Sequence, residues 1–308
     1  MSTAARWHSG VSTDAGPTRT NNEDRVYADD ANGIFLVIDG LGGHAAGEKA
    51  AEVALGVINR ELGEETADPE RRARRAITAA NNEIFRLAEQ QPEWRGMACV
   101  LTLVLLNGDR LTAAHVGDSR LYLLWSGTLR KLTSDHSPVG ELEDLGQLTE
   151  TEAMQHPRRH EVFRDVGSRL REPDEPDFVE IRSLPFHPAA ALLLCTDGLT
   201  DVLTATEIGE VINAYDGDPA SVAASLVKAA NERGGFDNVS VVFVPGPDFA
   251  PVPRDGAAHA RHAITRMRPP KPWWRTHGSQ IVWLLVGVVL GMMLWWVVEL
   301  VRGAGRLC

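Results

Sequence analysis

Acidic residues adjoin short apolar runs at four places in the chain. The four are Asp39, Asp118, Asp197 and Asp237. A carboxylate at the end of a strand can project from a rigid sheet edge into a shared cleft, and a following glycine lets the backbone carbonyl approach a ligand closely. Mg²⁺ and Mn²⁺ prefer carboxylate, carbonyl and water oxygens. A single Asp-Gly pair most often marks a turn, but four such sites predict a divalent-cation centre.

Seven short runs rich in Leu, Val and Ile are expected to be the strands that position these aspartates. They are Ile34–Ile38, Cys99–Leu106, Leu111–Val116, Leu121–Trp125, Leu129–Leu132, Ala191–Cys195 and Val239–Val244. The second to fifth runs are separated by Asn-Gly-Asp, Gly-Asp-Ser and Ser-Gly. This spacing predicts antiparallel strands joined by tight turns.

Helices are expected where apolar residues recur with helical spacing. The candidates are Ala45–Leu62, Pro69–Gln90, Glu207–Ala214 and Pro219–Arg233, with Asp68 and Asp218 as N-caps of the second and fourth. The polar stretch from Asp135 to Glu180 has little strand pattern, so we expect helical or irregular structure there. Strands and helices are segregated rather than alternating one for one. The order favours an α+β layered fold over a doubly wound parallel sheet.

Charge is distributed unevenly along the 308 residues, whose net charge is −11. The part from Val244 to the end carries +5 and the rest −16. An acidic body repels nucleic-acid phosphates, so nucleic-acid binding is disfavoured. The three cysteines are far apart and form no CxxC pair, which indicates neither a zinc site nor a disulfide framework. A reducing cytoplasm fits this pattern, and the first ten residues lack a secretory signal.

The C-terminal part differs from the acidic body. Residues 245–278 carry prolines and scattered arginines, as an extended linker does. Ile281–Val298 then contains no charged residue, and the stretch 279–300 matches a hydrocarbon core of about 30 Å. Tryptophans stand near both ends of the run, as in interfacial anchors. We expect one transmembrane helix here, followed by a short tail, 301–308; the alternative is a buried core helix or a dimerisation helix.

Five stretches of the acidic body match one family in order and spacing. They are Arg19–Asp24, Val37–His44, Val116–Arg120, Thr196–Leu199 and Asp237–Val239. Together they resemble the PPM family of type 2C protein phosphatases over roughly residues 8–244. The resemblance implies a Ser/Thr protein phosphatase domain spanning 1–244. It also implies an α-β-β-α sandwich, with two stacked antiparallel sheets flanked by helices and a metal cluster at one end.

The resemblance implies a role for each matching acidic residue. Asp39 is expected to bridge two cations, Mn²⁺ or Mg²⁺. The carbonyl of Gly40 would bind one of them, and Glu23 would contribute through water. Asp197 and Asp237 would hold the other cation.

Three further matches complete the site that the family implies. Asp118, with Asp197, would form a weaker third cation site. Arg19 matches the arginine that binds phosphate, and Asn238 looks like a residue that orients water or substrate. In this chemistry a hydroxide bridging two cations attacks phosphorus in line, while the cations and the arginine stabilise the charge on the transferring oxygens. No covalent phosphoenzyme is required, so Cys195 is expected to be a core residue.

The sequence departs from the family pattern at two places. Many eukaryotic members have histidine directly after the first Asp-Gly, whereas this chain has Leu41 there and its histidine at position 44. The general acid therefore stays open between His44 and a metal-bound water. The polar stretch from Asp135 to Glu180 contains the region that matches the family's flap. There the chain has His160 and Phe163 where bacterial relatives usually have asparagine and threonine.

Two other functions remain open at this level. The fold could serve as a catalytically silent sensor or binding module, although such relatives usually lose metal-site aspartates that this chain keeps. The same cations could also serve a phosphodiesterase or a small-molecule phosphatase. By family analogy we expect phosphoprotein partners, namely a bacterial Ser/Thr kinase and its substrates. Five Lys/Arg lie within about 20 residues before the apolar run and two follow it, so the catalytic domain is expected on the cytoplasmic face of the cell (inner) membrane.

Overall fold

A computed structural model describes residues 7–42, 45–63 and 68–251, all within one compact unit of the chain. His44, the linker after residue 251, the expected span 279–300 and the tail lie outside the described residues. Among the residues described, no helix combines the length and the apolar character that a membrane crossing requires. The expected anchor therefore stays a prediction.

Ten strands form two five-stranded sheets in which all neighbours are antiparallel. The first sheet has the order β1 (Gly10–Asp14), β10 (Val239–Pro245), β9 (Ala191–Cys195), β6 (Arg120–Trp125) and β7 (Thr128–Lys131). The second has the order β2 (Arg25–Asp29), β3 (Ile34–Leu41), β4 (Ala98–Asn107), β5 (Arg110–Val116) and β8 (Glu180–Pro185). The expected pair of antiparallel sheets is confirmed.

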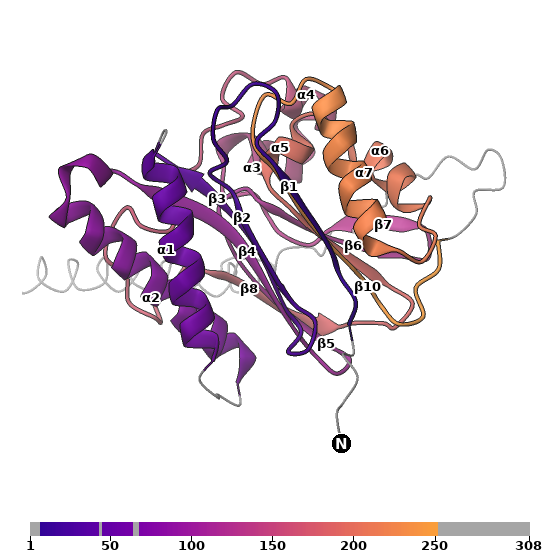
Figure 1. Ribbon diagram of the computed structural model, residues 1–308, viewed down its shortest axis with the longest axis horizontal. Helices are drawn as coiled ribbons and strands as arrows, with labels where there is room; N and C mark the ends of the chain where they lie inside the picture. Colours follow the sequence, from indigo (N-terminus) through magenta and orange to yellow (C-terminus); the bar gives the residue numbers. More distant parts are fainter. Residues whose placement is uncertain (1–6, 43–44, 64–67, 252–308) are drawn as a thin grey trace, which may run out of the picture. The chain divides into compact units, whose positions relative to one another are not determined.

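Helices cover the outer face of each sheet (Figure 1). They are α1 (Ala45–Leu62) and α2 (Pro69–Gln90) on the second sheet, and α6 (Ala205–Ile212) and α7 (Pro219–Glu232) on the first. Short helices α3 (Pro138–Asp144), α4 (Glu150–Met154) and α5 (Asp197–Thr200) and a 3-10 turn (Pro92–Trp94) lie in the connections. Asp68 and Asp218 accept hydrogen bonds from N–H groups of the first turns of α2 and α7, as predicted.

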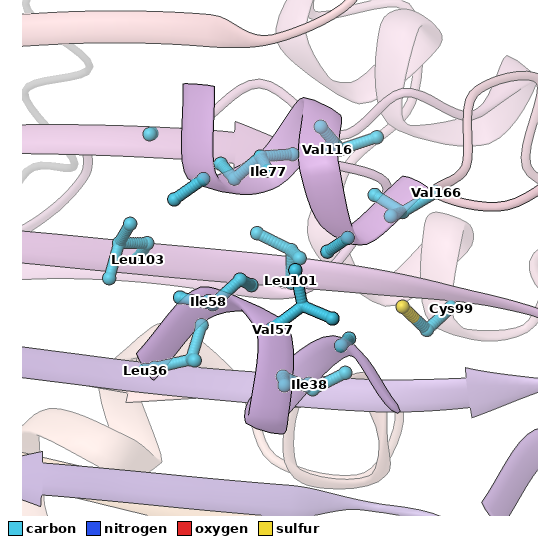
Figure 2. Close-up of a cluster of buried hydrophobic side chains, with 14 of the residues drawn as sticks. Leu36, Ile38, Val57, Ile58, Ile77, Cys99, Leu101, Leu103, Val116 and Val166 are labelled. Atoms are coloured by element: carbon cyan, nitrogen blue, oxygen red, sulfur yellow. The ribbon is translucent and has the colours of Figure 1, made fainter. Parts of the chain in front are cut away.

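Three apolar clusters hold the four layers together. One fills the space between α1, α2 and the second sheet, where Leu36, Ile58 and Leu101 meet (Figure 2). A second lies between the first sheet and helices α6 and α7. The third, which includes Phe35 and Leu194, lies between the two sheets. Each sheet is thus buried on both faces, which explains why its central strands are continuous apolar runs in the sequence.

The connection from β5 to β6 departs from the predicted tight turn between neighbours. β5 lies in one sheet and β6 in the other, so the chain crosses between sheets at Gly117–Ser119. Gly117 has a φ of +109°, and a Cβ there would lie 2.1 Å from a methyl carbon of Val100. Only glycine fits this close approach. The prediction was wrong at this point because turn signals do not reveal which strands pair.

The packed part of the chain continues slightly past residue 244. β10 ends at Pro245, and the ring of Phe249 packs against Tyr215 and Phe243, with centroids 5.4 and 6.0 Å apart. The expected helical or irregular insertion between Asp135 and Glu180 contains α3 and α4 and no strand before β8.

Candidate metal centre

Strand pairing brings the four strand-end aspartates to one end of the two sheets. In the first sheet, Cys195 at the end of β9 pairs with Val241 near the start of β10 and with Arg120 at the start of β6. Asp197, Asp237 and Asp118 therefore leave the same edge. In the second sheet, β4 pairs with both β3 and β5, and the C-terminal ends of these two strands lie beside the start of β4. Asp39 near the end of β3 and Asp118 just after β5 therefore lie at the same end of the sheet.

The carboxyl groups lie close enough to repel one another. Burial, followed by the charges of Asp24, Asp197, Asp118 and Asp237, raises the pKa of Asp39 well above its usual range. Burial and the neighbouring aspartates likewise raise the pKa of Asp197. The pKa values of Asp24 and Asp118 are raised to about 7, in both cases chiefly by burial. Such a cluster needs protons or cations to offset its charge.

The donor set fits hard divalent cations. Asp24 accepts a hydrogen bond from the hydroxyl of Thr196 on Oδ2, at 2.9 Å, but its buried Oδ1 has no hydrogen-bond partner among the described residues. Within the same part of the chain, the buried Oδ1 of Asp197 has no partner either. Buried polar atoms in native proteins are normally satisfied. Carboxylate oxygens that converge without donors are the ligands that Mg²⁺ and Mn²⁺ take.

Close glycine packing places Glu23 and Gly40 beside Asp39. A Cβ on Gly40 would lie 2.2 Å from the carbonyl oxygen of Gly47 in the first turn of α1, and 2.8 Å from the carbonyl oxygen of Glu23. A Cβ on Gly47 would lie 2.1 Å from Glu23 Oε2. Both positions must be glycine for α1 to approach β3 and for the Glu23 carboxylate to reach the site.

Asn238 positions the loop that precedes β2. Its Oδ1 accepts a hydrogen bond from the N–H of Glu23 at 2.7 Å, and its Nδ2 donates to the carbonyls of Ala15 and Asn21 at 3.0 and 2.9 Å. The family resemblance implied that Asn238 orients water or substrate. In the structure the side-chain amide of Asn238 is hydrogen-bonded to backbone groups. It therefore holds Glu23 in place, although the two residues are 215 positions apart in the sequence.

Arg19 lies at the solvent-exposed edge of the site. Its Nη2 is 2.8 Å from Asp237 Oδ2, and its Nε donates to the carbonyl of Phe236 at 3.3 Å. Two of its nitrogens are thus held before any substrate binds. The residue expected to bind phosphate and the expected ligand Asp237 are direct neighbours.

Two acidic residues of the centre were not among the predicted ligands. Asp24 is the second carboxyl of the Glu23-Asp24 pair and is almost fully buried. Asp201 follows Asp197 by four residues, so both face the same side of α5 and the turn after it. Ligand atoms of Asp201, Asp197 and His160 lie within 4.8 Å of one another. The spacing of Asp197 and Asp201 was visible in the sequence, whereas the contact with His160 was not.

A small cavity separates this centre from the insertion that carries α3 and α4. It has a volume of about 30 Å³, enough for one or two waters. Its lining includes Asp118, Asp197 and Asp201 together with Arg120 and Asp135. Burial alone would raise the pKa of Asp135, but the charges of Arg120 and Lys131 outweigh it and lower the pKa to about 2.

A buried histidine pair supports the crossing that carries Asp118. His115 Nε2 is 2.9 Å from the carbonyl of Gly117, and the N–H of Gly117 donates to His136 Nδ1 at 3.0 Å. The rings lie 4.9 Å apart. Burial, followed by His136, lowers the pKa of His115 to about 4, so its imidazole is neutral at physiological pH. Since these ring nitrogens already have backbone partners, we assign the pair a structural role.

Without cations, the protein is expected to lose stability as the pH rises from 6.5 to 8.5. Asp24 and Asp118 have pKa values of about 7 in the folded protein, against an ordinary value of 3.8. The folded state therefore holds more protons than the unfolded state in this window, so its free energy of unfolding falls as those protons leave. In EDTA we expect the melting temperature to drop by about 5 °C or more across the window.

Excess Mn²⁺ should reverse that loss at pH 8.5, because a ligand that binds only the folded state stabilises it. The window begins at the ordinary pKa of histidine, 6.5, so His115, which is neutral in the folded protein, opposes the loss only near the lower end of the window; Asp135, whose pKa is about 2, does not contribute to the slope. A melting temperature in EDTA that rises between pH 6.5 and 8.5 would contradict the convergence of the four carboxyls.

Comparison with known proteins agrees, over most of the chain, with the family resemblance found in the sequence. Residues 17–229 match the family described as Protein phosphatase 2C. The serine/threonine phosphatase stp of Listeria monocytogenes is 35% identical over 247 residues, which cover 77% of this chain and 95% of the relative. The crystal structure of the Mycobacterium tuberculosis serine/threonine phosphatase PstP/Ppp has a TM-score of 0.69 and 33% identity, covering 78% of this chain and 98% of that one.

A second similar structure contains metal. It is the catalytic domain of the serine/threonine protein phosphatase PstP in complex with 2 manganese ions, with a TM-score of 0.69 and 32% identity, covering 78% of this chain and 97% of that one. The family match includes Glu23, Asp39, Asp118 and Asp197 and ends before Asp237.

Proposed function

Since the chain belongs to the protein phosphatase 2C family, we propose that it removes phosphate from phosphoserine and phosphothreonine side chains of proteins. It is a metal-dependent phosphoric monoester hydrolase. The observation that carries the proposal is the group of mutually repelling carboxyls, with unpartnered oxygens on Asp24 and Asp197, beside the exposed guanidinium of Arg19.

Two divalent cations, Mn²⁺ or Mg²⁺, supply a water of lowered pKa and positive charge beside the phosphate when they are bound. Asp39, the Gly40 carbonyl, Asp197 and Asp237 are the groups that would hold these cations, and Glu23 would contribute through water. Asp118 lies next to Asp197 and is suited to a third, weaker site, to which Asp201 adds a carboxyl.

Arg19 binds and orients the phosphate. A guanidinium offers a fork of donors that matches two phosphate oxygens, and such charge-assisted bonds are about twice as strong as neutral ones. The bonds to Asp237 and to the Phe236 carbonyl orient the guanidinium in advance, which reduces the entropy lost on binding. Asn238 acts at one remove, by holding Glu23.

The proposed substrate class is tested with a phosphothreonine peptide and bis(p-nitrophenyl) phosphate, in wild type and in Arg19→Ala. Wild type is expected to prefer the monoester peptide. Arg19→Ala is expected to lower kcat/KM on the peptide by about 30- to 100-fold, the loss of one charged phosphate contact, while leaving Mn²⁺ affinity within about threefold of wild type.

Arg19→Lys should recover little of that loss, because lysine offers a point charge and no fork. Faster turnover of the diester than of the peptide would assign the centre to phosphodiester hydrolysis. Binding of phosphopeptide without any turnover in the presence of Mn²⁺ would instead favour a silent binding module.

A bacterial Ser/Thr kinase and its substrates are the proposed partners. The support is the family analogy and the names of the relatives, which are Ser/Thr phosphatases of bacteria. A comparison of the phosphoproteome with and without the protein identifies them. If no phosphosite changes between the two phosphoproteomes, the proposed partners are rejected.

The C-terminal stretch 279–300 is proposed to anchor the protein to the cell membrane by a single pass. Its 18-residue run without charge and its flanking tryptophans support this proposal. The excess of Lys/Arg before the run supports a cytoplasmic catalytic domain. The part of the predicted linker that follows Phe249 would let that domain search a volume near the membrane, which raises its effective concentration towards membrane-bound partners.

Truncation after Gly278 tests the anchor. Full-length protein is expected in the membrane pellet and should resist extraction with high salt, whereas the truncated form should be soluble and hydrolyse a phosphopeptide at the wild-type rate. Release of the full-length protein by salt alone would indicate a peripheral contact. An inactive truncated form would show that the apolar helix is part of the fold.

A further inference from the structure

The loop between α7 and β10 carries a phenylalanine that is largely in water. Phe236 exposes 64% of its surface, the highest value among the exposed large apolar residues of the described part of the chain. The two residues before it, Gly234 and Gly235, have φ values of +130° and +52°, a backbone that side chains rarely adopt. The glycines therefore shape a loop that presents the Phe236 ring outward.

The residue that carries this ring adjoins the proposed phosphate-binding edge of the site through its backbone. The carbonyl of Phe236 accepts a hydrogen bond from Arg19 Nε, and Asp237 follows in the chain. A peptide advances by at most about 3.6 Å per residue. A phosphorylated residue at Arg19 thus places the residues on either side of it within reach of the Phe236 ring.

A groove continues from this loop between β1 and α7, which lie side by side (Figure 1). Its volume is about 610 Å³, within the range of ligand sites. Asp14 and Pro17 line one wall, and Ala224 and Lys228 line the other. A Cβ on Gly235 would lie 2.3 Å from Pro17 Cδ, so the groove wall packs directly on the Phe236 loop.

The charged groups of the groove lining are Lys228 and the carboxylates of Asp14 and Glu232, each with a partner in the lining. Asp14 Oδ1 accepts hydrogen bonds from the N–H of Gly16 at 2.7 Å and from Asn231 Nδ2 at 3.1 Å. Lys228 Nζ lies 3.7 Å from Glu232 Oε1, one turn further along α7. With one cation and two carboxylates the lining has a formal charge of −1, which disfavours an acidic occupant and leaves apolar contact with the Phe236 ring as the main source of selectivity.

We propose that the Phe236 ring and the β1–α7 groove bind the residues that flank the phosphorylated residue of the protein substrate, and that an apolar side chain within three positions of it packs on Phe236. This docking surface deepens the proposed function, on which it rests. It makes Phe236 a residue that determines substrate specificity through KM, while the cation ligands determine turnover.

The test uses two phosphothreonine peptides that differ only in flanking residues, leucine in one and serine in the other, with p-nitrophenyl phosphate as a substrate too small to reach the groove. In wild type, the leucine peptide should have the lower KM. Phe236→Ser should lower kcat/KM for the leucine peptide by about 5- to 20-fold relative to p-nitrophenyl phosphate, mostly through KM.

A second variant tests the groove without touching the loop. Ala224 is exposed on α7, so Ala224→Arg keeps the helix and fills the groove with a long side chain. We expect it to raise the KM of both peptides by about 3- to 10-fold. Trp125→Ser is the matched control, because Trp125 is a half-exposed aromatic residue at the far end of β6 and should leave the peptide preference unchanged.

Three results would overturn this inference. Equal losses on the leucine peptide and on p-nitrophenyl phosphate would mean that Phe236 acts through Asp237 and the cations. An unchanged leucine-over-serine preference in Phe236→Ser, together with unchanged KM values of both peptides in Ala224→Arg, would show that the surface does not bind substrate. A wild-type dimer in sedimentation that becomes a monomer in Ala224→Arg would assign the groove to a second copy of the chain. Wild type that cleaves p-nitrophenyl phosphate but neither peptide would reject the proposed function itself.

Discussion

Replacing Asp39 with asparagine is expected to lower kcat for p-nitrophenyl phosphate by at least about 10³-fold. Asparagine keeps the shape of the side chain but removes the anion that lies among Asp24, Asp118, Asp197 and Asp237. Incubation of wild type with EDTA should abolish activity to a similar degree, and excess Mn²⁺ should restore it only in the wild type. The measurement is steady-state hydrolysis with Mn²⁺ titrated from zero.

The same substitution should stabilise the metal-free protein. Burial and four neighbouring carboxyls raise the pKa of Asp39, so ionising it costs free energy in the folded state. The side-chain amide of Asp39→Asn cannot ionise, and we expect the melting temperature of this variant in EDTA at pH 8.5 to be about 3 °C or more above that of wild type. A variant that is inactive and yet more stable cannot owe its inactivity to misfolding.

Asp29→Asn is the matched control. Asp29 also ends a strand of the second sheet, but it accepts hydrogen bonds from the turn residue Asn32, and these chiefly lower its pKa. We expect the kcat of Asp29→Asn to stay within about twofold of wild type, since Asp29 lies outside the cluster of carboxyls around Asp39. A kcat for Asp39→Asn within tenfold of wild type would remove Asp39 from the cation centre.

The central strands could be predicted because burial on both faces gives them an unmistakable pattern. β3 is an apolar run that leads into Asp39-Gly40, and β9 is an apolar run followed, after Thr196, by Asp197-Gly198. The strands that were missed are β1, β2 and β8, each at or beside a sheet edge. β1 is Gly-Val-Ser-Thr-Asp with four of five residues at least partly exposed. A strand that buries so little needs few apolar residues, so propensity alone does not reveal it.

The centre was predictable to the extent that its residues adjoin strands. Asp39, Asp118, Asp197 and Asp237 were identified in this way, and the strand register places them at one end of the sheets. Asp24 precedes β2, which was not predicted as a strand. The role of Asn238 depends on hydrogen bonds across more than 200 residues of chain, which no local pattern encodes. The membrane anchor stays a prediction.

Replacing Arg120 with alanine is expected to lower the free energy of unfolding by about 3 kcal/mol, the lower end of the cost of breaking a buried ion pair. Arg120 Nη2 lies 2.6 Å from Asp135 Oδ2 and 2.8 Å from Glu143 Oε2. Arg120 and Asp135 expose only 9% and 5% of their surface. In Arg120→Ala, Lys131 Nζ, which lies 3.4 Å from Asp135 Oδ1, would still offset part of the Asp135 charge. The melting temperature should fall by about 6 to 12 °C.

The dependence of this loss on pH identifies its cause. Burial works against ionised Asp135, but Arg120 and Lys131 together bring its pKa down to about 2, below the ordinary value of 3.8. The pair therefore contributes stability above about pH 4, and this contribution is lost as the pH falls towards 2. The difference between wild type and Arg120→Ala should shrink over that range. A difference that is constant from pH 7 to pH 2.5 would indicate lost packing instead.

The double variant Arg120→Met, Asp135→Asn distinguishes the effect of losing the charges from the effect of losing side-chain packing. Removing both charges leaves no charged Asp135 buried without Arg120, and Glu143, which also loses Arg120, is only partly buried; we therefore expect the double variant to be more stable than Arg120→Ala by about 1–3 kcal/mol. The ion pair joins β6 to the turn before α3 next to Asp118, whose pKa the Arg120 charge lowers and the Asp135 charge raises. Losing Arg120 alone should therefore raise the proton affinity of Asp118 and weaken the third cation site, whereas losing both charges should leave that site closer to wild type. Mn²⁺ titrations of the two variants, followed by melting temperature, distinguish these outcomes.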